Sequence, residues 1–388
     1  MNIAMLLETL SSNNGVSRIA LSLGEEFIRR GHEMHIYASV NHLPKRGRKT
    51  FADPKIHFHW LPSLRGSWRT WSLPLGALSV PLAGRLPGGM LQPGRRHDVI
   101  VSHALTLRQD VIQIHNDPQK VEEDKLARVP FSIDPPPLRT ARRKIRAELE
   151  RLRFSPGNYR GVIAHSRRSA RETGAAFGIP EDRIDVIPHG VDSGYFSPSA
   201  AAGQRAGLRQ RLGLSPEEVA FLYVGDSWKC LEFAIRGLAR LPARAPKALL
   251  AVGPFPKKLF ARFAQEQGVR FLYEDLWEDL RSIYSVADVL LNPTPLDTFS
   301  LISLEAMSMG LPIVTTQYAG ISELLTHGSD AFVLESPSDP VLIAEACLSL
   351  LEPDVRRGMA QRARKFALSR SWEQAASLHL RHYSALQL

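Results

Sequence analysis

Short apolar runs alternate along this chain with amphipathic stretches, and the alternation predicts a parallel α/β sheet. Ile3 to Leu7 form the first apolar run, a polar loop follows through Gly15, and an amphipathic helix is expected from Val16 to Arg30. A strand from Glu33 to Ala38 completes a β-α-β unit. Further strands are expected at 98–102, 111–114 and 162–166.

The alternation starts again at Val219, after a segment rich in Ser, Pro, Ala and Gly from Ser197 to Gly203. That composition predicts a linker, and the length of 388 residues has room for two domains of ordinary size. In the second half, strands are expected at 219–224, 248–252, 269–273 and 289–291.

The stretch from Leu290 to Leu325 carries the clearest chemical signal. A buried strand ending at Asn292-Pro293 is followed by Asp297, and then by a segment that is apolar nearly all round as a helix, so it should be buried. Glu305 lies inside that helix, where a carboxylate is costly without a partner. The free N–H groups near Ser300 form an anion site at the start of the helix.

Two carboxylates beside an anion site suit a ligand that carries hydroxyls and phosphates, such as a nucleotide-sugar. The structural alternative is that Asp297 caps the helix and that Glu305 pairs with a buried arginine. The spacing alone leaves both interpretations open.

The same stretch resembles the acidic Glu-x7-Glu signature of the family-4 retaining glycosyltransferases, also called group 1. In the pattern E-x-F-G-L-x-x-x-E-A-M, Asp297 takes the place of the first Glu, Ser300 that of the Gly, and Glu305 matches the second Glu. Residues 15–38 and 161–192 are similar to other parts of the family, which usually has Asn or His at the position of His189.

The resemblance implies an α/β protein of the GT-B fold, with two Rossmann-like domains that face across a cleft. Residues 1–196 would form the acceptor-side domain and 204–370 the donor-binding domain. Residues 371–388 would be a closing helix that packs back on the first domain.

The resemblance also implies roles for individual residues. Glu305 would hold the ribose hydroxyls of a nucleotide-sugar donor, and Asp297 the hydroxyls of the transferred sugar. Lys229 would stabilise the donor diphosphate. Backbone groups of Gly15, Phe299, Ser300 and Leu301 would also contact the donor.

His115 follows a predicted strand, at the edge where α/β sheets bind ligands. It also resembles the histidine with which the family contacts the donor sugar. His103 is the competing candidate, and a structural role for His115 is the alternative.

The chain departs from the usual G-R-x-x-x-x-K-G loop of the family. Asp226 stands in place of the Arg and Cys230 in place of the Gly, so Lys229 is the candidate cation for the diphosphate. Arg236 is the next choice. Alternatively, Lys229 is a solvated residue at the start of a helix.

The net charge of +10 lies entirely in residues 1–200, which carry 29 Lys/Arg and 19 Asp/Glu. This asymmetry points to an anionic partner, either an anionic lipid-linked or phosphorylated saccharide acceptor or an anionic membrane surface. A basic amphipathic helix is expected at 139–154, and residues 62–97 could touch a bilayer interface or form an irregular insertion. Both charged features could also be ordinary solvated surface.

Two cysteines and no recognisable signal peptide fit a cytoplasmic protein, peripheral at most on the inner face of the membrane. Sequence spacing shows no metal-ligand cluster and no nucleic-acid motif, so we expect no metal, no cofactor and no nucleic-acid partner. The favoured function is sugar transfer in cell-envelope polysaccharide or lipopolysaccharide synthesis. Alternatives are another GT-B enzyme, such as an epimerase or phosphorylase, and a non-catalytic basic binding protein.

Overall fold

The computed structural model describes residues 1–11, 14–41, 54–60, 97–137, 140–274 and 279–386. The chain divides into two compact units. Unit 1 comprises Met1–Val121, Arg139–His189 and Trp372–Leu388, and unit 2 comprises Glu122–Leu138 and Gly190–Ser371. The segment expected at 62–97 lies almost wholly outside the described residues.

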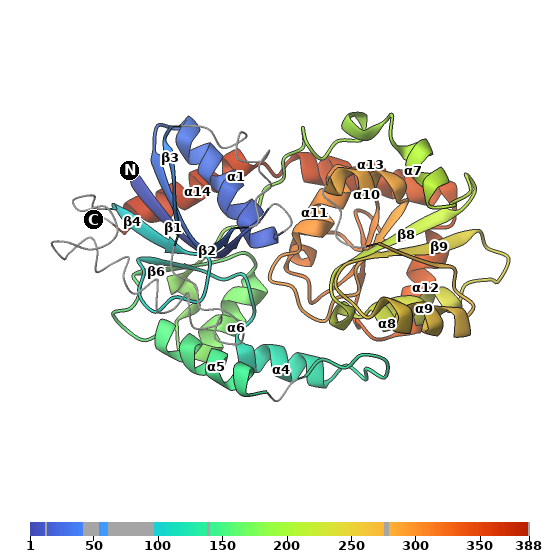
Figure 1. Ribbon diagram of the computed structural model, residues 1–388, viewed down its shortest axis with the longest axis horizontal. Coiled ribbons are helices and arrows are strands. Elements are labelled where there is room, and N and C mark those ends of the chain that lie inside the picture. The colour runs from blue at the N-terminus through green and yellow to red at the C-terminus, as the bar shows by residue number, and fades with distance from the viewer. Residues whose placement is uncertain (12–13, 42–53, 61–96, 138–139, 275–278, 387–388) are drawn as a thin grey trace. The chain divides into compact units, whose positions relative to one another are not determined.

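Unit 1 is built on a parallel sheet of seven strands in the order β3-β2-β1-β4-β5-β6-β7 (Figure 1). The strand order reverses between β1 and β4, as in doubly wound folds. The strands are β1 (Asn2–Leu10), β2 (Glu33–Asn41), β3 (Ile56–Trp60), β4 (Val99–Ser102), β5 (Val111–Gln113), β6 (Gly161–Ala164) and β7 (Ile184–Val186).

The helices of unit 1 follow the strands that the sequence predicted, and most begin at a side-chain cap. Asn14 caps α1 by accepting from the backbone N–H of Ser17, and Thr140 caps α5 in the same way from Arg143. The elements are α1 (Gly15–Arg29), α5 (Ala141–Arg153), α6 (Arg167–Phe177), the 3-10 turn η3 (Glu181–Arg183) and α14 (Trp372–Ala385). Helix α4 (Gln119–Ala127) spans the boundary between the units.

Helix α14 returns the end of the chain to unit 1, where it packs beside α1 (Figure 1). Arg30 donates to the carbonyl of Glu373 at 2.8 Å, and Tyr383 is fully buried against Phe27. Gly161 allows this close packing, because a Cβ there would lie 2.4 Å from Nε2 of His382. The expected closing helix is therefore confirmed.

Unit 2 is a second parallel sheet, with six strands in the order β10-β9-β8-β11-β12-β13. Its order reverses between β8 and β11. The strands are β8 (Val219–Val224), β9 (Lys247–Val252), β10 (Phe271–Glu274), β11 (Val289–Leu291), β12 (Ile313–Thr316) and β13 (Phe332–Leu334).

Helices connect these strands on both faces of the sheet. They are α7 (Arg205–Arg211), α8 (Leu231–Ala239), α9 (Lys257–Glu266), α10 (Leu280–Val286), α11 (Leu301–Ser308), α12 (Pro340–Ser349) and α13 (Pro353–Leu368). Shorter 3-10 turns are η4 (Ser199–Ala201), η5 (Ser227–Lys229) and η6 (Gly320–Leu324).

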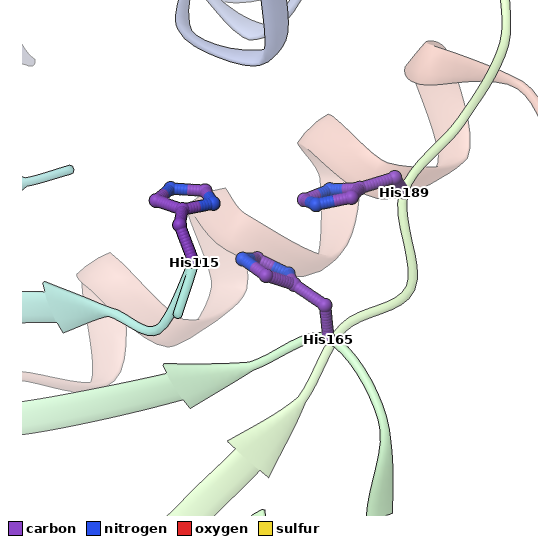
Figure 2. A group of neighbouring side chains, drawn as sticks. All are labelled: His115, His165 and His189. Atoms are coloured by element: carbon purple, nitrogen blue, oxygen red, sulfur yellow. The ribbon is translucent and has the colours of Figure 1, made fainter. Parts of the chain in front are cut away.

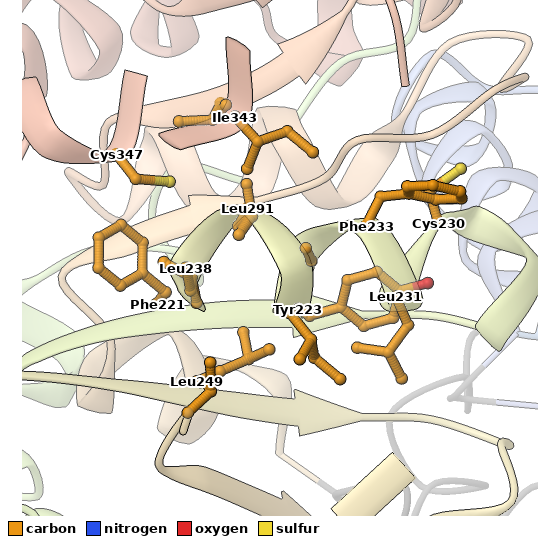
Figure 3. Packing of buried hydrophobic residues seen from close by; sticks show 14 of the residues in the cluster. Phe221, Tyr223, Cys230, Leu231, Phe233, Leu238, Leu249, Leu291, Ile343 and Cys347 are labelled. Carbon is orange, nitrogen blue, oxygen red and sulfur yellow. The ribbon is translucent and has the colours of Figure 1, made fainter. Parts of the chain in front are cut away.

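The core of unit 2 follows from the alternation of side chains along β8. Phe221 and Tyr223 point to the face covered by α8 and α12, while Ala220 and Leu222 point to the other face, which α11 covers. Figure 3 shows the first of these clusters, in which Ile343 packs against α8. A Cβ on Gly237 would lie 2.3 Å from Ile343, so that glycine lets the two helices pack closely.

Several features differ from the sequence predictions. Strands β3 and β13 were not expected. The expected linker at 197–203 contains η4, and Ser308 donates to the carbonyl of Phe196, so this segment is part of unit 2. Residues 122–138 also belong to unit 2, whereas the sequence analysis included them in the first domain.

Residues 122–138 are held on unit 2 through the buried carboxylate of Glu232. It accepts hydrogen bonds from the backbone N–H groups of Ser132 (2.9 Å) and Ile133 (3.0 Å) and from the Ser132 hydroxyl (2.6 Å). Burial acts to raise the pKa of Glu232, but the hydrogen bonds from Ser132 and its other donors hold that pKa below its ordinary value. Ser227 donates to Asp134 at 2.6 Å.

Candidate functional site

The order of the strands in unit 2 identifies where a ligand is expected. In doubly wound sheets, ligands bind beyond the carboxyl ends of the strands where the strand order reverses. In unit 2 these strands are β8 and β11. The chain leaves β8 through Gly225 into the loop with Lys229, and it leaves β11 through Asn292 into the loop with Asp297.

Lys229 and Asp297 meet at this edge. Nζ of Lys229 lies 3.0 Å from Oδ2 of Asp297, and both side chains are largely buried, with exposed fractions of 20% and 15%. The other oxygen, Oδ1, accepts from the backbone N–H of Phe299 at 3.2 Å. The ammonium group is therefore held by a carboxylate at the point where the strand order reverses.

Two glycines make room for the lysine side chain. Gly225 has a φ of 142°, and a Cβ there would lie 3.1 Å from Cδ of Lys229. Gly253, at the end of β9, has a φ of 144°, and a Cβ there would lie 2.3 Å from the carbonyl oxygen of Gly225. Backbone thus packs against backbone beneath the lysine, and no side chain fits between the two strand ends.

Ser300 is the N-cap residue of α11 and has a left-handed backbone with φ of 85°. Few residues other than glycine adopt this conformation. The Ser300 hydroxyl is bound on both sides: Asn292 Nδ2 donates to it at 3.1 Å, and Ser303 Oγ lies at 2.9 Å. The loop thus keeps the conformation for which the family pattern has Gly. Phe299 before it is buried, and Leu301 after it is half-buried.

Glu305 is buried on α11, as expected for a helix that is apolar nearly all round. The hydroxyl of Tyr284, on α10, donates to Oε2 of Glu305 at 2.9 Å. Tyr284 is thus one partner of this carboxylate, and it is a group that the structural alternative did not include. Sequence reasoning missed Tyr284, because it is separated from Glu305 by 21 positions and carries no motif.

The other polar groups near Lys229 make contacts within the protein. Arg236, the second candidate cation, donates to Glu232 at 2.9 Å and to the Ser132 hydroxyl at 3.0 Å. Burial raises the pKa of Asp226, and the charge of Lys229 partly offsets this effect. Cys230 is buried and, with φ of 70°, has the left-handed backbone for which the family has Gly.

In unit 1, Gly15 and His115 lie on separate elements that leave the carboxyl edge of the sheet. Gly15 is the first residue of α1, after β1, and its φ is not positive. A need for left-handed backbone therefore does not explain this glycine. His103 follows β4 and His115 follows β5, and Nδ1 of His103 lies 3.0 Å from Nε2 of His115. The two candidate histidines are thus hydrogen-bonded to each other.

His115 also belongs to a group of histidines that the sequence did not predict. His165 follows β6 and His189 follows β7, and Figure 2 shows their rings beside that of His115. The ring centroids of His165 and His189 are 3.8 Å apart, and those of His115 and His165 are 4.9 Å apart. Spacing could not reveal this group, because its members come from three different strands.

The histidines of this group are uncharged at neutral pH. Burial holds the pKa of His115 and of His189 well below the ordinary value, and a proton on a neighbouring histidine would lower it further. Burial lowers the pKa of His165 to about 4 and that of His379, on α14, to about 3.

The basic helix expected at 139–154 forms as α5, but only part of its charge faces solvent. Arg153 is buried and donates to the carbonyl of Ser102, and burial lowers its pKa to about 10. Arg146 pairs with Glu150 at 2.9 Å and Arg151 pairs with Glu148. Lys144 is exposed.

Comparisons with known proteins agree with this geometry. A family model described as "Glycosyltransferase Family 4" matches residues 13–195, and one described as "Glycosyl transferases group 1" matches residues 218–353. The D-inositol 3-phosphate glycosyltransferase of Nocardia farcinica is 30% identical over 240 residues, which are 58% of this chain and 52% of that protein. The chain spans about half the length of the curated relatives that it matches first.

Solved structures share the fold over nearly the whole chain. The crystal structure of WaaG, a glycosyltransferase involved in lipopolysaccharide biosynthesis, has a TM-score of 0.78 at 19% identity, covering 97% of this chain and 98% of that one. Anabaena Alr3699/HepE, in complex with UDP and glucose, has a TM-score of 0.73 at 16% identity, covering 99% of this chain and 100% of that one.

Two Rossmann-like units, each a parallel sheet with a reversal in strand order, define this molecule as a protein of the GT-B fold. The predicted fold class is confirmed. With one family model on each half, the chain belongs to the group 1 glycosyltransferases, as the sequence resemblance indicated.

Proposed function

We propose that this protein is a retaining glycosyltransferase that moves a sugar from a nucleotide-sugar to a glycan or lipid-linked acceptor. The observation that carries the proposal is the Lys229–Asp297 pair, 3.0 Å apart at the strand-order reversal of unit 2. A cation held by a carboxylate at a ligand-binding edge is suited to a donor with both phosphates and sugar hydroxyls.

Each group of the site has a role in this proposal. The donor diphosphate replaces Asp297 as the partner of Lys229. Asp297 then accepts hydrogen bonds from the hydroxyls of the transferred sugar. Glu305, oriented by Tyr284, accepts from the ribose hydroxyls. The backbone N–H groups of Phe299, Ser300 and Leu301, at the start of α11, support the donor phosphates. In unit 1, Gly15 gives the donor a close backbone approach and His115 contacts its sugar.

The proposed reaction retains the configuration at the anomeric carbon. The bond from that carbon to the phosphate oxygen breaks, and the acceptor oxygen bonds to the same face. The proton of the acceptor hydroxyl passes to the leaving phosphate. Lys229 stabilises the negative charge that grows on this leaving group, which typically contributes several kcal/mol.

The transfer itself is proposed to need neither a metal ion nor a cofactor. The cation that a metal would supply to the diphosphate is supplied by Lys229. We expect the rate of sugar transfer to be unchanged in excess EDTA. If EDTA lowers the rate and added Mg²⁺ restores it, this part of the proposal is contradicted.

The acceptor is proposed to be an anionic saccharide, lipid-linked or phosphorylated, in the synthesis of cell-envelope polysaccharide or lipopolysaccharide. The excess charge of residues 1–200 supports an anionic acceptor. The names of two similar proteins, one acting on inositol 3-phosphate and one in lipopolysaccharide biosynthesis, are consistent with it.

We further propose that the protein works at the cytoplasmic face of a membrane, held peripherally by basic side chains. Among the described residues, no helix is both long enough and apolar enough to cross a bilayer. Because Arg153 is buried and Arg146 is paired, the exposed Lys144 and its neighbours on α5 would make the contact. Sedimentation with anionic vesicles should decrease as salt is added.

A panel of nucleotide-sugars tests the central proposal. A donor at a hundred times its dissociation constant should stabilise the protein by about 2.7 kcal/mol, which a thermal shift detects. The donor that stabilises the protein should then be hydrolysed slowly to nucleoside diphosphate, and NMR of a transfer product should show a retained anomer. Stabilisation without hydrolysis or transfer would favour a binding protein, and an inverted anomer would contradict the mechanism.

A further inference from the structure

The histidines at the carboxyl edge of unit 1 form a group with the geometry of a metal site. One ring nitrogen from each of His115, His165 and His189 lies within 4.8 Å of the other two. His165 and His189 are buried, whereas His115 is half-buried. The three residues follow the adjacent strands β5, β6 and β7.

We propose that His115, His165 and His189 bind a divalent transition-metal ion, with Zn²⁺ as the best match, and that His115 leaves the donor-sugar contact while the metal is bound. Three imidazoles with an open fourth position are one of the established ligand sets for Zn²⁺. At a Zn–N distance of about 2.0–2.1 Å, tetrahedral nitrogens lie about 3.4 Å apart. The nitrogens, within 4.8 Å of one another, are therefore at most about 1.4 Å too far apart for such a site.

His165 is already oriented for metal binding. Its Nδ1 lies 2.9 Å from the carbonyl oxygen of Ile187, and because a carbonyl only accepts, Nδ1 carries the proton. The lone pair is therefore on Nε2, a buried atom with no hydrogen-bond partner. A backbone carbonyl that fixes the tautomer of a histidine is the usual outer partner of a metal ligand.

The residues around the three histidines favour a transition-metal ion such as Zn²⁺ over Mg²⁺ or Ca²⁺. The buried guanidinium of Arg153 acts electrostatically on His103 and His115 and repels cations. Mg²⁺ and Ca²⁺ need carboxylate oxygens to overcome such repulsion, whereas Zn²⁺, Ni²⁺ and Cu²⁺ form strong bonds to neutral imidazole.

A second group of the described residues, Glu33, His35 and His57, has comparable spacing but supports a site less well. Nε2 of His57 lies 2.7 Å from Oε1 of Glu33, so these two side chains already satisfy each other. The group also lies at the start of β2 and β3, away from the carboxyl edge. A substitution in this second group therefore provides a control for the metal-binding test.

Co²⁺ is the probe, because a tetrahedral site gives it a visible d–d spectrum. The full chain is stripped with a chelator, dialysed and titrated with Co²⁺, and Zn²⁺ is then added to displace the cobalt. The parent protein should bind one Co²⁺ ion per chain with a tetrahedral spectrum. His189→Asn, a residue that the family itself has at this position, should weaken binding by at least about 10–100-fold, the loss that follows from removing even an outer partner.

Two further variants keep the test decisive. His165→Ala should also abolish the tetrahedral spectrum, whereas His57→Ala should leave it unchanged, and thermal melting should show that each variant is folded. Absence of a tetrahedral spectrum in the parent would overturn the proposal, as would a spectrum that persists in both His189→Asn and His165→Ala. Binding is measured directly, so the result is independent of whether the protein transfers sugar.

Discussion

The hydroxyl of Tyr284 donates a hydrogen bond to Oε2 of Glu305 at 2.9 Å, and both side chains are buried. The tyrosine lies on α10 and the glutamate on α11, so the contact fixes one oxygen of a carboxylate that the helix alone would leave free to rotate. Tyr284 is thereby a positioning residue for the carboxylate that we assign to the donor ribose.

Glu305→Gln should weaken donor binding by about 10–100-fold while the protein stays folded, because a hydrogen bond to a charged group contributes about 1.5–3 kcal/mol. Tyr284→Phe removes only the hydroxyl and should weaken donor binding through Glu305. The two changes should therefore be non-additive in a double-mutant cycle of donor dissociation constants. Fully additive effects would contradict the assigned role of Tyr284.

Lys229→Ala should lower the turnover number by about 10²–10³-fold, because the mutant lacks the cation that meets the charge growing on the leaving diphosphate. Affinity for nucleoside diphosphate should fall in parallel. Lys258→Ala is the matched control, since Lys258 is exposed on α9 in the same unit. If the activity of Lys229→Ala stays within a few-fold of that of the parent, another cation binds the diphosphate.

Cys230 has a left-handed backbone with φ of 70°, which costs a non-glycine residue about 1–2 kcal/mol. Cys230→Gly should therefore be more stable than Cys230→Ala. The expected difference in the free energy of unfolding is about 0.5–1 kcal/mol, because the greater freedom of glycine in the unfolded chain offsets part of the gain. Urea unfolding measures the difference. Cys347, buried inside α12, is the control, because there Gly should be less stable than Ala by about 1 kcal/mol.

The buried histidines predict a loss of stability in mild acid. The pKa of His165 is lowered to about 4 and that of His379 to about 3, from 6.5 in the unfolded chain, so the unfolded state binds more protons. Their contribution is complete above about pH 6.5 and is lost as the pH falls from there toward 4. The urea midpoint should fall between pH 7 and 5, and His379→Gln should flatten that dependence. A midpoint independent of pH would show that folding does not lower the pKa of these histidines.

The sequence was sufficient for those parts of the fold that depend on local patterning. The strand from Val289 to Leu291 and the all-apolar helix after it were predicted closely, because their burial is visible in the residues themselves. Family resemblance located Lys229 and Asp297, although their roles stay predictions. It did not show that they form an ion pair, because 68 positions separate them and only the sheet brings them together.

The parts that sequence reasoning missed depend on contacts between distant segments. Tyr284 appears as an ordinary core aromatic until the structure puts its hydroxyl against Glu305. The residues at 122–138 lie between two segments of unit 1, and contacts such as those with the buried Glu232 show that they belong to unit 2. Ser300 and Cys230 looked like departures from a glycine pattern, yet both keep the left-handed backbone of that pattern.

The division of the chain between the units has a consequence for how the protein is synthesised. Every residue of unit 2, including Glu122–Leu138, leaves the ribosome before α14 does. Unit 1 cannot complete its core until α14 emerges, because Tyr383 of that helix is fully buried against Phe27. The second unit can therefore fold first, and the nascent first unit must wait, with the apolar face of α1 uncovered and open to chaperones, until the last helix arrives.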